Sequence, residues 1–328
     1  MRNEIMRRLF IFLLFLQNLY AAQISYKVDN EAYKTSTSVY LKPTQKLKMR
    51  FSIKNAKIIR WYQIIPNTLK FYKNANQPWE DNAYKWSGYG KIDYQRVEIK
   101  SFKNKKEVEL TSKILEENRP NNNPYYHSKL GSFWFEVEVV KTNGKIVKTK
   151  GINDVGEKGL SPKVFRVSYM ASDDYLGYLT TFFNVPGIFG SMPYQSRNYI
   201  GVDCANVLVA TSKVMNKQKN TKNYNVVMLV EKLKTKVKTK IVHGTPIDKL
   251  KWGKEFEKGD FIAVKYTENG RYVHIGMLYA DENNNGILDK EDSIMNAGPN
   301  ALHLAPLSKG GFNGTVVILK NEDLQEKK

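Results

Sequence analysis

The chain has 328 residues, and its 52 lysines and arginines against 32 aspartates and glutamates give a formal net charge of +20. A single cysteine, Cys204, excludes an internal disulfide. No recognisable nucleic-acid-binding motif accompanies the positive charge, so we expect no nucleic-acid partner. The charge is typical either of a solvated, lysine-rich surface or of attraction to an anionic polymer.

Residues 1–22 are typical of a secretory signal peptide. Basic residues at Arg2, Arg7 and Arg8 precede an apolar run over residues 9–16, and small residues follow at Ala21 and Ala22. The run is too short to cross a bilayer, for which about 20 residues are needed, and no later stretch is long and apolar enough. We therefore expect a secreted or periplasmic protein with no membrane span after the signal is removed.

Residues 23–165 have the pattern of an all-β domain. Short runs of alternating apolar and polar residues are separated by turns, as in residues 132–140 and the hairpin signal at residues 142–145. Within residues 132–140, Glu136 and Glu138 alternate with apolar residues, which predicts one solvated face. The number of short strands predicts an immunoglobulin-like sandwich.

Two features of this segment leave alternatives open. Residues 61–94 are rich in Trp, Tyr and Asn, which is typical of aromatic packing inside a β domain or of exposed aromatics that stack on sugar rings. His127 lies in an asparagine-rich loop, and we expect it to be solvated.

The pattern changes after a glycine-containing segment at residues 151–162, and residues 166–328 predict a second domain with both helices and strands. A capped, amphipathic segment at residues 172–183 predicts a helix. A second helix is expected over residues 204–217, because apolar residues recur there at helical spacing. The whole chain is therefore expected to be an α+β protein.

Cys204 is the first residue of this second helix. Backbone N–H groups and the helix dipole at that position favour the thiolate, so we expect a pKa below the ordinary value of a free thiol. A buried packing residue is the alternative. A lone thiol in an exported protein favours a chemical role.

His274 lies on the strand expected over residues 272–279. Val273, Ile275 and Met277 share one apolar face of this strand, which leaves His274 on the other face. A histidine of this kind is suited to act as the base that a cysteine nucleophile needs.

Three motifs in this order resemble those of the NlpC-type cell-wall cysteine peptidases. They are Gly201-Val-Asp-Cys204 at a helix start, Gly259-Asp-Phe-Ile262 and Val273-His-Ile-Gly-Met-Leu278 on strands. The resemblance implies a papain-like domain, with the cysteine helix packed on an antiparallel sheet. It also implies a hydrolase that cleaves peptide stems of peptidoglycan, with Cys204 as nucleophile, His274 as base and no catalytic cofactor.

The family places a third polar residue on the strand after the histidine strand. If Ala280 pairs with Asp292, Gly276 faces Asn296, which then lies diagonally beside His274 on the same face. Asn296 is therefore the expected orienting residue. His303 is the second choice, and His243 is not favoured.

The substrate side of the site is expected to include Asp203, Tyr194 and Tyr199. The family's Ser-Gly after the cysteine is Ala205-Asn206 here, and its upstream tyrosine has no unambiguous counterpart. Two alternatives to a peptidoglycan hydrolase therefore remain: a catalytically inactive protein that binds the cell wall, and an amidase acting on another envelope substrate. The expected partner is peptidoglycan or another anionic envelope polymer.

A twelve-residue segment between the histidine and asparagine strands resembles a calcium-binding loop. Gly286 occupies the sixth position, where such loops turn sharply. The expected ligands are side chains at five positions and one backbone carbonyl: Asp281, Asn283, Asn285, Ile287, Asp289 and Asp292. We expect weak, structural Ca²⁺ binding; an ordinary polar hairpin loop is the alternative.

Overall fold

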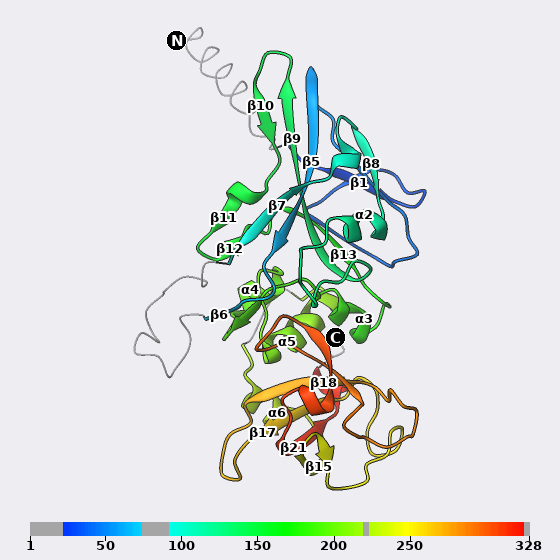
Figure 1. The fold of residues 1–328 in the computed structure, drawn as a ribbon, viewed down its shortest axis with the longest axis vertical. Coiled ribbons are helices and arrows are strands. Elements are labelled where there is room, and N and C mark those ends of the chain that lie inside the picture. Colours follow the sequence, from blue (N-terminus) through cyan, green and yellow to red (C-terminus); the bar gives the residue numbers. More distant parts are fainter. Residues whose placement is uncertain (1–21, 74–91, 219–222, 325–328) are drawn as a thin grey trace, which may run out of the picture.

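The computed structural model describes residues 22–73, 92–218 and 223–324. The chain is α+β, as expected, and it contains two β regions with helices between them (Figure 1). The expected signal peptide falls almost entirely on residues 1–21, outside the described residues, and so does the middle of the aromatic segment at residues 74–91.

The first β region is a pair of facing sheets. One sheet has the strand order β2 (Lys34–Thr35), β1 (Ser25–Val28), β4 (Leu47–Arg50) and β8 (Glu107–Leu110). The other has the order β3 (Ser38–Leu41), β13 (Phe165–Tyr169), β9 (Gly131–Lys141), β5 (Ala56–Pro66) and β7 (Tyr94–Glu98), with β10 (Ile146–Lys148) also paired to β9. A short helix, α2 (Ser112–Glu117), follows β8.

Apolar side chains from both sheets form one buried cluster between them. Leu47 and Met49 come from one sheet, and Trp61, Phe133 and Phe135 come from the other. Every second residue of β9 belongs to this cluster because side chains alternate along a strand. The two sheets thus share one apolar core, and Trp61, fully buried, is a core residue and not an exposed sugar platform.

The structure corrects two expectations for this region. Glu136 is 1% exposed, and its carboxylate accepts hydrogen bonds from Arg96 at 2.7 Å and from the backbone N–H of Ile152 at 2.9 Å. The predicted solvated face is thus a buried ion-pair network, since an unpaired carboxylate would be too costly there. His127 is not solvated either, because its ring stacks on Phe183 with 3.8 Å between centroids.

The second β region is a seven-stranded antiparallel sheet. Its order is β16 (Thr245–Pro246), β15 (Thr235–Val242), β21 (Gly314–Leu319), β17 (Phe261–Lys265), β18 (His274–Ala280), β19 (Ser293–Asn296) and β20 (His303–Pro306). Four helices precede its first strand: α3 (Tyr175–Thr180), α4 (Pro193–Arg197), α5 (Cys204–Met215) and α6 (Val226–Lys232). The remaining short pairs are β6 (Phe71–Lys73) with β14 (Gly187–Phe189), and β11 (Val155–Gly156) with β12 (Gly159–Leu160).

Both faces of this sheet are packed. Ile275 and Met277 of β18 belong to the cluster that contains the apolar residues of α5. Leu278 belongs to a cluster on the opposite face, which also contains Ile294 and Phe312. By strand alternation His274 belongs to this second face, so the expectation that its face is left free of packing is wrong.

The two regions share a continuous interface. Strand β13 pairs with β9 as far as Tyr169, so the first sheet extends past residue 165, where we expected the boundary. Trp134 of the first region packs in the same cluster as Phe182 and Tyr199. Helices α3, α4 and α5 lie between the two β regions in Figure 1, and α3 and α5 contribute to the apolar cluster on one face of the second sheet.

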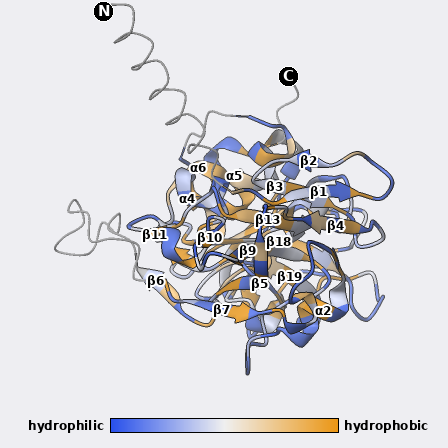
Figure 2. Ribbon diagram, turned by 90° about the horizontal axis from the view of Figure 1, so that it is seen from above, coloured by the Kyte–Doolittle hydropathy of each residue, from blue (hydrophilic) through white to orange (hydrophobic). Residues whose placement is uncertain are grey.

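The hydropathy of the residues follows the arrangement of strands and loops. Hydrophobic ribbon is concentrated on the central strands, and hydrophilic ribbon lies mainly on the surrounding loops (Figure 2). Among the described residues, none of the helices has the length and apolar character needed to span a bilayer.

Candidate active site

Helix α5 begins where the sequence predicted, because Asp203 caps its first turn. The Asp203 carboxylate accepts a hydrogen bond from the Asn206 backbone N–H at 2.6 Å, as an N-cap residue does. The Asn206 amide donates to the Ser191 carbonyl at 2.6 Å, and the Asp203 N–H donates to Ser191 Oγ at 3.1 Å. Asn206, which departs from the family motif, therefore fixes the start of α5 to the preceding loop.

Cys204 is only partly exposed, and the backbone of Ile275 in β18 acts on its sulfur. Burial and the neighbouring Asp203 carboxylate raise the pKa of the Cys204 thiol from 9.0 to about 12. The expected lowering by the helix N-terminus is therefore wrong for the free protein: its N–H groups are present, but desolvation of the thiolate outweighs them. The thiol is neutral at pH 7.

His274 and Asn296 are in direct contact. His274 Nε2 and Asn296 Oδ1 are 3.2 Å apart. Met277 pairs with Met295, which is the register that the sequence predicted at this point. The predicted pairing of Ala280 with Asp292 is wrong by one residue, because a β-bulge between Leu278 and Ala280 shifts Ala280 onto Ser293.

The hydrogen bond to Asn296 determines the useful tautomer of His274. Because a carbonyl oxygen only accepts, Nε2 carries the proton, and the lone pair of the neutral ring is on Nδ1. Burial lowers the pKa of His274 from 6.5 to about 4, against smaller raising effects from Asn296 and the Gly310 carbonyl. The imidazole is therefore neutral at pH 7 and able to accept a proton.

The thiol of α5 and the imidazole of β18 both lie near the start of β18. The sulfur lies at Ile275, one residue from His274, and the imidazole is held by Asn296 on the adjacent strand. Helix α5 packs on the Ile275 face, whereas His274 begins β18 on the opposite face. The thiol and the imidazole therefore lie on different faces at the start of β18, and among the described residues no hydrogen bond joins them.

The other histidines have separate roles. His303 pairs with Asn296 across β19 and β20, and its Nδ1 lies 2.7 Å from the Ala301 carbonyl. Its ring packs on Tyr125 of the first β region, 5.1 Å between centroids. His303 therefore packs between β19 and the first β region. His243 lies in an exposed turn with a φ of 51°.

The three expected substrate residues have different environments in the structure. Asp203 is an N-cap, and Tyr194 on α4 is 37% exposed, with Lys158 Nζ 4.8 Å from its ring centroid. Tyr199 corrects our expectation: it is 2% exposed and stacks on Phe182 with 4.3 Å between centroids. Because its hydroxyl also bonds to Thr181 at 2.8 Å, Tyr199 is a packing residue.

Sequence reasoning missed Tyr266 and the Gly310–Gly311 pair. Tyr266 directly follows β17 and is 59% exposed, and its hydroxyl donates to the Gly311 carbonyl at 3.1 Å. Burial, and then the nearby Cys204, raise the pKa of Tyr266. An aromatic residue at a strand end beside the motif strand was the available signal. The glycine pair gave no signal of its own, since it comes from a distant segment.

The calcium-like loop satisfies its polar groups internally. The amide nitrogens of Asn283 and Asn285 both donate to Asp289, at 2.8 and 2.7 Å. Asp281 accepts from the backbone N–H of Gly286 at 2.7 Å, and Ile287 forms an isolated bridge with Lys251. Asp292 is fully buried, and its carboxylate accepts from Trp252 Nε1 at 2.9 Å and from the Asp289 N–H at 3.0 Å.

Asp292 therefore anchors the loop. Binding of Ca²⁺ would require the side chains of Asn283 and Asn285 to rotate away from Asp289. Across residues 22–73, 92–218 and 223–324, no group of three or more His, Cys, Asp or Glu side chains is arranged to hold a metal. Gly286 has the left-handed φ, 72°, that the sixth position of such a loop needs. Structural calcium stays a prediction.

We expect 10 mM Ca²⁺ to stabilise the protein by about 1.4 kcal/mol if Kd is about 1 mM, which is roughly 2 °C in Tm for a chain of this length. Differential scanning calorimetry with and without Ca²⁺ measures the shift. Asp281→Asn is the matched control, because an amide oxygen still accepts from Gly286 while the ligand charge is lost. An unchanged Tm in the wild type would show that this is an ordinary polar loop.

The two shifted groups at the site predict the pH dependence. With a pKa of about 12, the Cys204 thiolate fraction at pH 7 is roughly 10³-fold below that of a thiol at 9.0. Alkylation by iodoacetamide, followed by mass spectrometry, should therefore be slow at pH 7 and should accelerate about tenfold per pH unit. A rate that reaches its plateau below pH 8 would contradict this.

In acid, the free energy of unfolding should depend on the protonation of His274. Because its folded pKa, about 4, lies below the unfolded value of 6.5, its contribution is complete above pH 6.5. It is lost as the pH falls to 4, and it amounts to at most about 3 kcal/mol. The raised pKa of Cys204 acts at the other end, where stability is lost as the pH rises from 9.0 toward 12.

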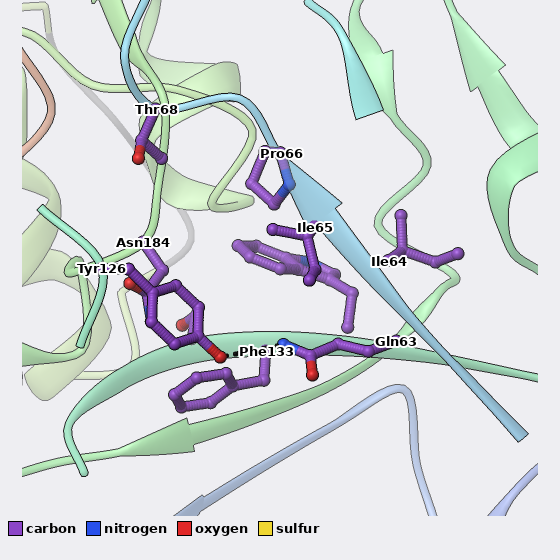
Figure 3. Close-up of a pocket in the computed structure, with 10 residues that line it drawn as sticks. Gln63, Ile64, Ile65, Pro66, Thr68, Tyr126, Phe133 and Asn184 are labelled. Atoms are coloured by element: carbon purple, nitrogen blue, oxygen red, sulfur yellow. Dashed lines mark hydrogen bonds between the residues drawn. The ribbon is translucent and has the colours of Figure 1, made fainter. Parts of the chain in front are cut away.

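A small cavity in the first β region does not belong to this site. Figure 3 shows Tyr126 and Gln63 joined across it by a 3.2 Å hydrogen bond, with Ile65, Phe133 and Asn184 on its walls. Its volume, about 10 Å³, has room for at most one water molecule. None of its lining residues is Cys204, His274 or Asn296. It is a packing defect and not a substrate pocket.

Comparisons of the chain with protein-family models, curated proteins and solved structures find no match. The assignment of function therefore depends on the motifs and on the geometry around Cys204 and His274.

Proposed function

We propose that the protein is an exported cysteine hydrolase of the NlpC type, which cleaves amide bonds in peptidoglycan stem peptides. The observation that supports this most is the 3.2 Å contact between His274 and Asn296, because it leaves Nδ1 as the basic nitrogen. Cys204 at the start of α5, beside Ile275 of the same strand, is the nucleophile. Helix α5 on the antiparallel sheet is the reduced papain-like arrangement that we propose for this domain.

Acylation begins from a neutral pair. The Cys204 thiol and His274 are not hydrogen-bonded to each other in the free protein, so substrate binding must bring them together. As the Cys204 sulfur then attacks the amide carbon, its proton passes to Nδ1 of His274, and a carbon–sulfur bond forms. The resulting imidazolium is stabilised by Asn296 Oδ1, which accepts from Nε2–H. It then gives its proton to the leaving nitrogen, the carbon–nitrogen bond breaks, and a thioester on Cys204 remains. Backbone N–H groups at the start of α5 stabilise the oxyanion.

Deacylation repeats the steps with water. His274 accepts a proton from the water as its oxygen attacks the thioester carbon. The carbon–sulfur bond breaks, the proton returns to sulfur, and a carboxylic acid leaves. Because the thiol is neutral at rest, His274 must act during the attack and not before it.

The charge of the protein supports an anionic envelope substrate. Lys238 and Lys240 of β15 are exposed on the second domain, and the chain as a whole carries a net charge of +20. Long-range attraction of this kind raises the rate of encounter with an anionic polymer and weakens with salt. We propose that the protein acts in the periplasm or outside the cell, without a catalytic cofactor.

Mass spectrometry of digested sacculi tests the function. Purified sacculi incubated with the wild type should release peptides with new amino and carboxyl ends, and Cys204→Ala should release none. Ser191→Ala, which removes one hydrogen bond near the helix start, is a control for general damage. Equal release by Cys204→Ala and the wild type would refute the proposal.

The raised thiol pKa favours a second candidate, a papain-like protein that binds cell-wall peptides without cleaving them. Such a protein would co-sediment with sacculi in a salt-dependent manner while the released peptides stay at background. Release by the wild type, absent in Cys204→Ala, excludes this candidate.

A further inference from the structure

The segment at residues 310–312 lies beside the imidazole. The rings of His274 and Phe312 are 4.9 Å apart between centroids, and Phe312 is fully buried. The Gly310 backbone favours the charged form of the same imidazole. A Cβ at Gly311 would lie 3.9 Å from His274 Cδ2, so the backbone itself passes close to the ring.

Tyr266 holds this segment in place. Its hydroxyl donates to the Gly311 carbonyl at 3.1 Å, next to the end of the ladder in which Lys265 of β17 pairs with Thr315 of β21. A Cβ at Gly311 would lie 3.8 Å from the same hydroxyl, so Gly311 is between Tyr266 and His274. Gly311 has a φ of 81°, which favours glycine, and neither Gly310 nor Gly311 has a side chain to fix this turn.

We propose that Tyr266 is a positioning residue for the base: its hydroxyl fixes Gly311, and the segment at residues 310–312 thereby holds the His274 ring against Asn296 and keeps water from it. The proposal rests on the proposed function in one respect, since it affects hydrolysis only if His274 is the base. The contacts that carry it concern the free protein.

The charged and titratable groups around the ring determine the expected effect. His303 on β20 lowers the pKa of His274, and Tyr266 after β17 faces the adjoining Gly311. Cys204 at the start of α5 acts on Tyr266, and the exposed Lys309 precedes Gly310 in the chain. Burial is the largest cause of the low pKa of His274, and the Gly310 carbonyl opposes it. Releasing the segment admits water to the ring, and the loss of burial should outweigh the loss of the Gly310 contribution. The pKa of His274 should therefore rise from about 4 toward 6.5.

Nuclear magnetic resonance of the full chain with ¹³C-labelled histidine tests this, because the chain has only 4 histidines to resolve. Tyr266→Phe should move the His274 titration upward by about one pH unit. Gly311→Ala, which strains the same turn, should move it in the same direction. Tyr272→Phe is the matched control: Tyr272 lies in the same hairpin and is partly buried, and its hydroxyl has no hydrogen bond among the described residues.

A His274 titration that superimposes on the wild type in both Tyr266→Phe and Gly311→Ala overturns the proposal. The measurement does not depend on hydrolysis. If the titration moves while the wild type cleaves no sacculi, the positioning role stands and the hydrolase proposal fails. If the wild type does cleave, the acid limb of kcat/KM should move with the titration in Tyr266→Phe and stay in place in Tyr272→Phe.

Discussion

His274→Ala is expected to lower kcat/KM for stem-peptide hydrolysis by about 10³-fold, in the range for loss of a general base. The physical reason is specific to this site. The Cys204 thiol, with a pKa of about 12, does not ionise by itself at pH 7, so without the imidazole almost no sulfur is in the reactive form. Rates should be measured at several pH values, because the variant should regain activity only as hydroxide replaces the base.

His243→Asn is the control for this variant. His243 is exposed and has a left-handed φ of 51°, which asparagine accepts readily, so the change should leave both stability and rate near the wild type. Thermal unfolding of both variants checks that the fold is retained. A His274→Ala protein that is folded and cleaves within about threefold of the wild type would exclude the imidazole as base.

Asn296→Ala is expected to lower kcat by roughly 10²-fold with little change in KM, because the residue acts on the base and not on the substrate. Its Oδ1 is the acceptor, 3.2 Å from His274 Nε2, that fixes the tautomer. Without it the ring can carry its proton on Nδ1, and the sulfur then has no base. The separate values of kcat and KM on a synthetic stem peptide measure this.

Asn296→Asp separates orientation from simple packing. Asn296 Nδ2 is buried and has no hydrogen-bond partner among the described residues, so replacing it by oxygen breaks no such bond. The carboxylate should still accept from Nε2–H and should raise the pKa of His274, which moves the acid limb of the rate profile upward. Ser293→Ala, on the same strand, is the control. An Asn296→Asp variant as impaired as Asn296→Ala, with an unmoved acid limb, would contradict the orienting role.

The part of the site that local pattern determines was predictable. Cys204 begins a helix because Asp203 caps it and apolar residues follow at helical spacing. The register that brings Asn296 to His274 follows from alternation on two neighbouring strands, and the Met277–Met295 pair confirms it. The bulge next to it was not predictable, since an extra residue in a polar loop can be accommodated at either end.

What the sequence did not predict depends on burial by distant segments. The pKa of Cys204 is set by desolvation, and a helix start looks the same in sequence whether it is covered or open. Tyr199 resembles a substrate residue by its distance from Cys204 along the chain, but the first β region covers it: the Arg166 guanidinium lies 3.7 Å from its ring centroid. Glu136 follows the polar alternation of a solvated strand, and only the arrival of Arg96 shows that it is buried.

Tyr266 and the segment at residues 310–312 illustrate the same limit. Their contact joins the end of β17 to a turn that lies 45 positions later in the chain. Short-range periodicity carries no information on such a pair. Positions of this kind are the ones at which structure adds most to a motif.

The central claim is that one thiol and one imidazole act as a unit, and a double-mutant cycle tests it most directly. kcat/KM on the same stem peptide is measured for the wild type, Cys204→Ala, His274→Ala and the double variant. Groups that act together are strongly non-additive, so the account predicts that the double variant is no slower than the slower single variant. Losses that multiply, with each single variant retaining activity that the double variant lacks, would show that Cys204 and His274 act independently.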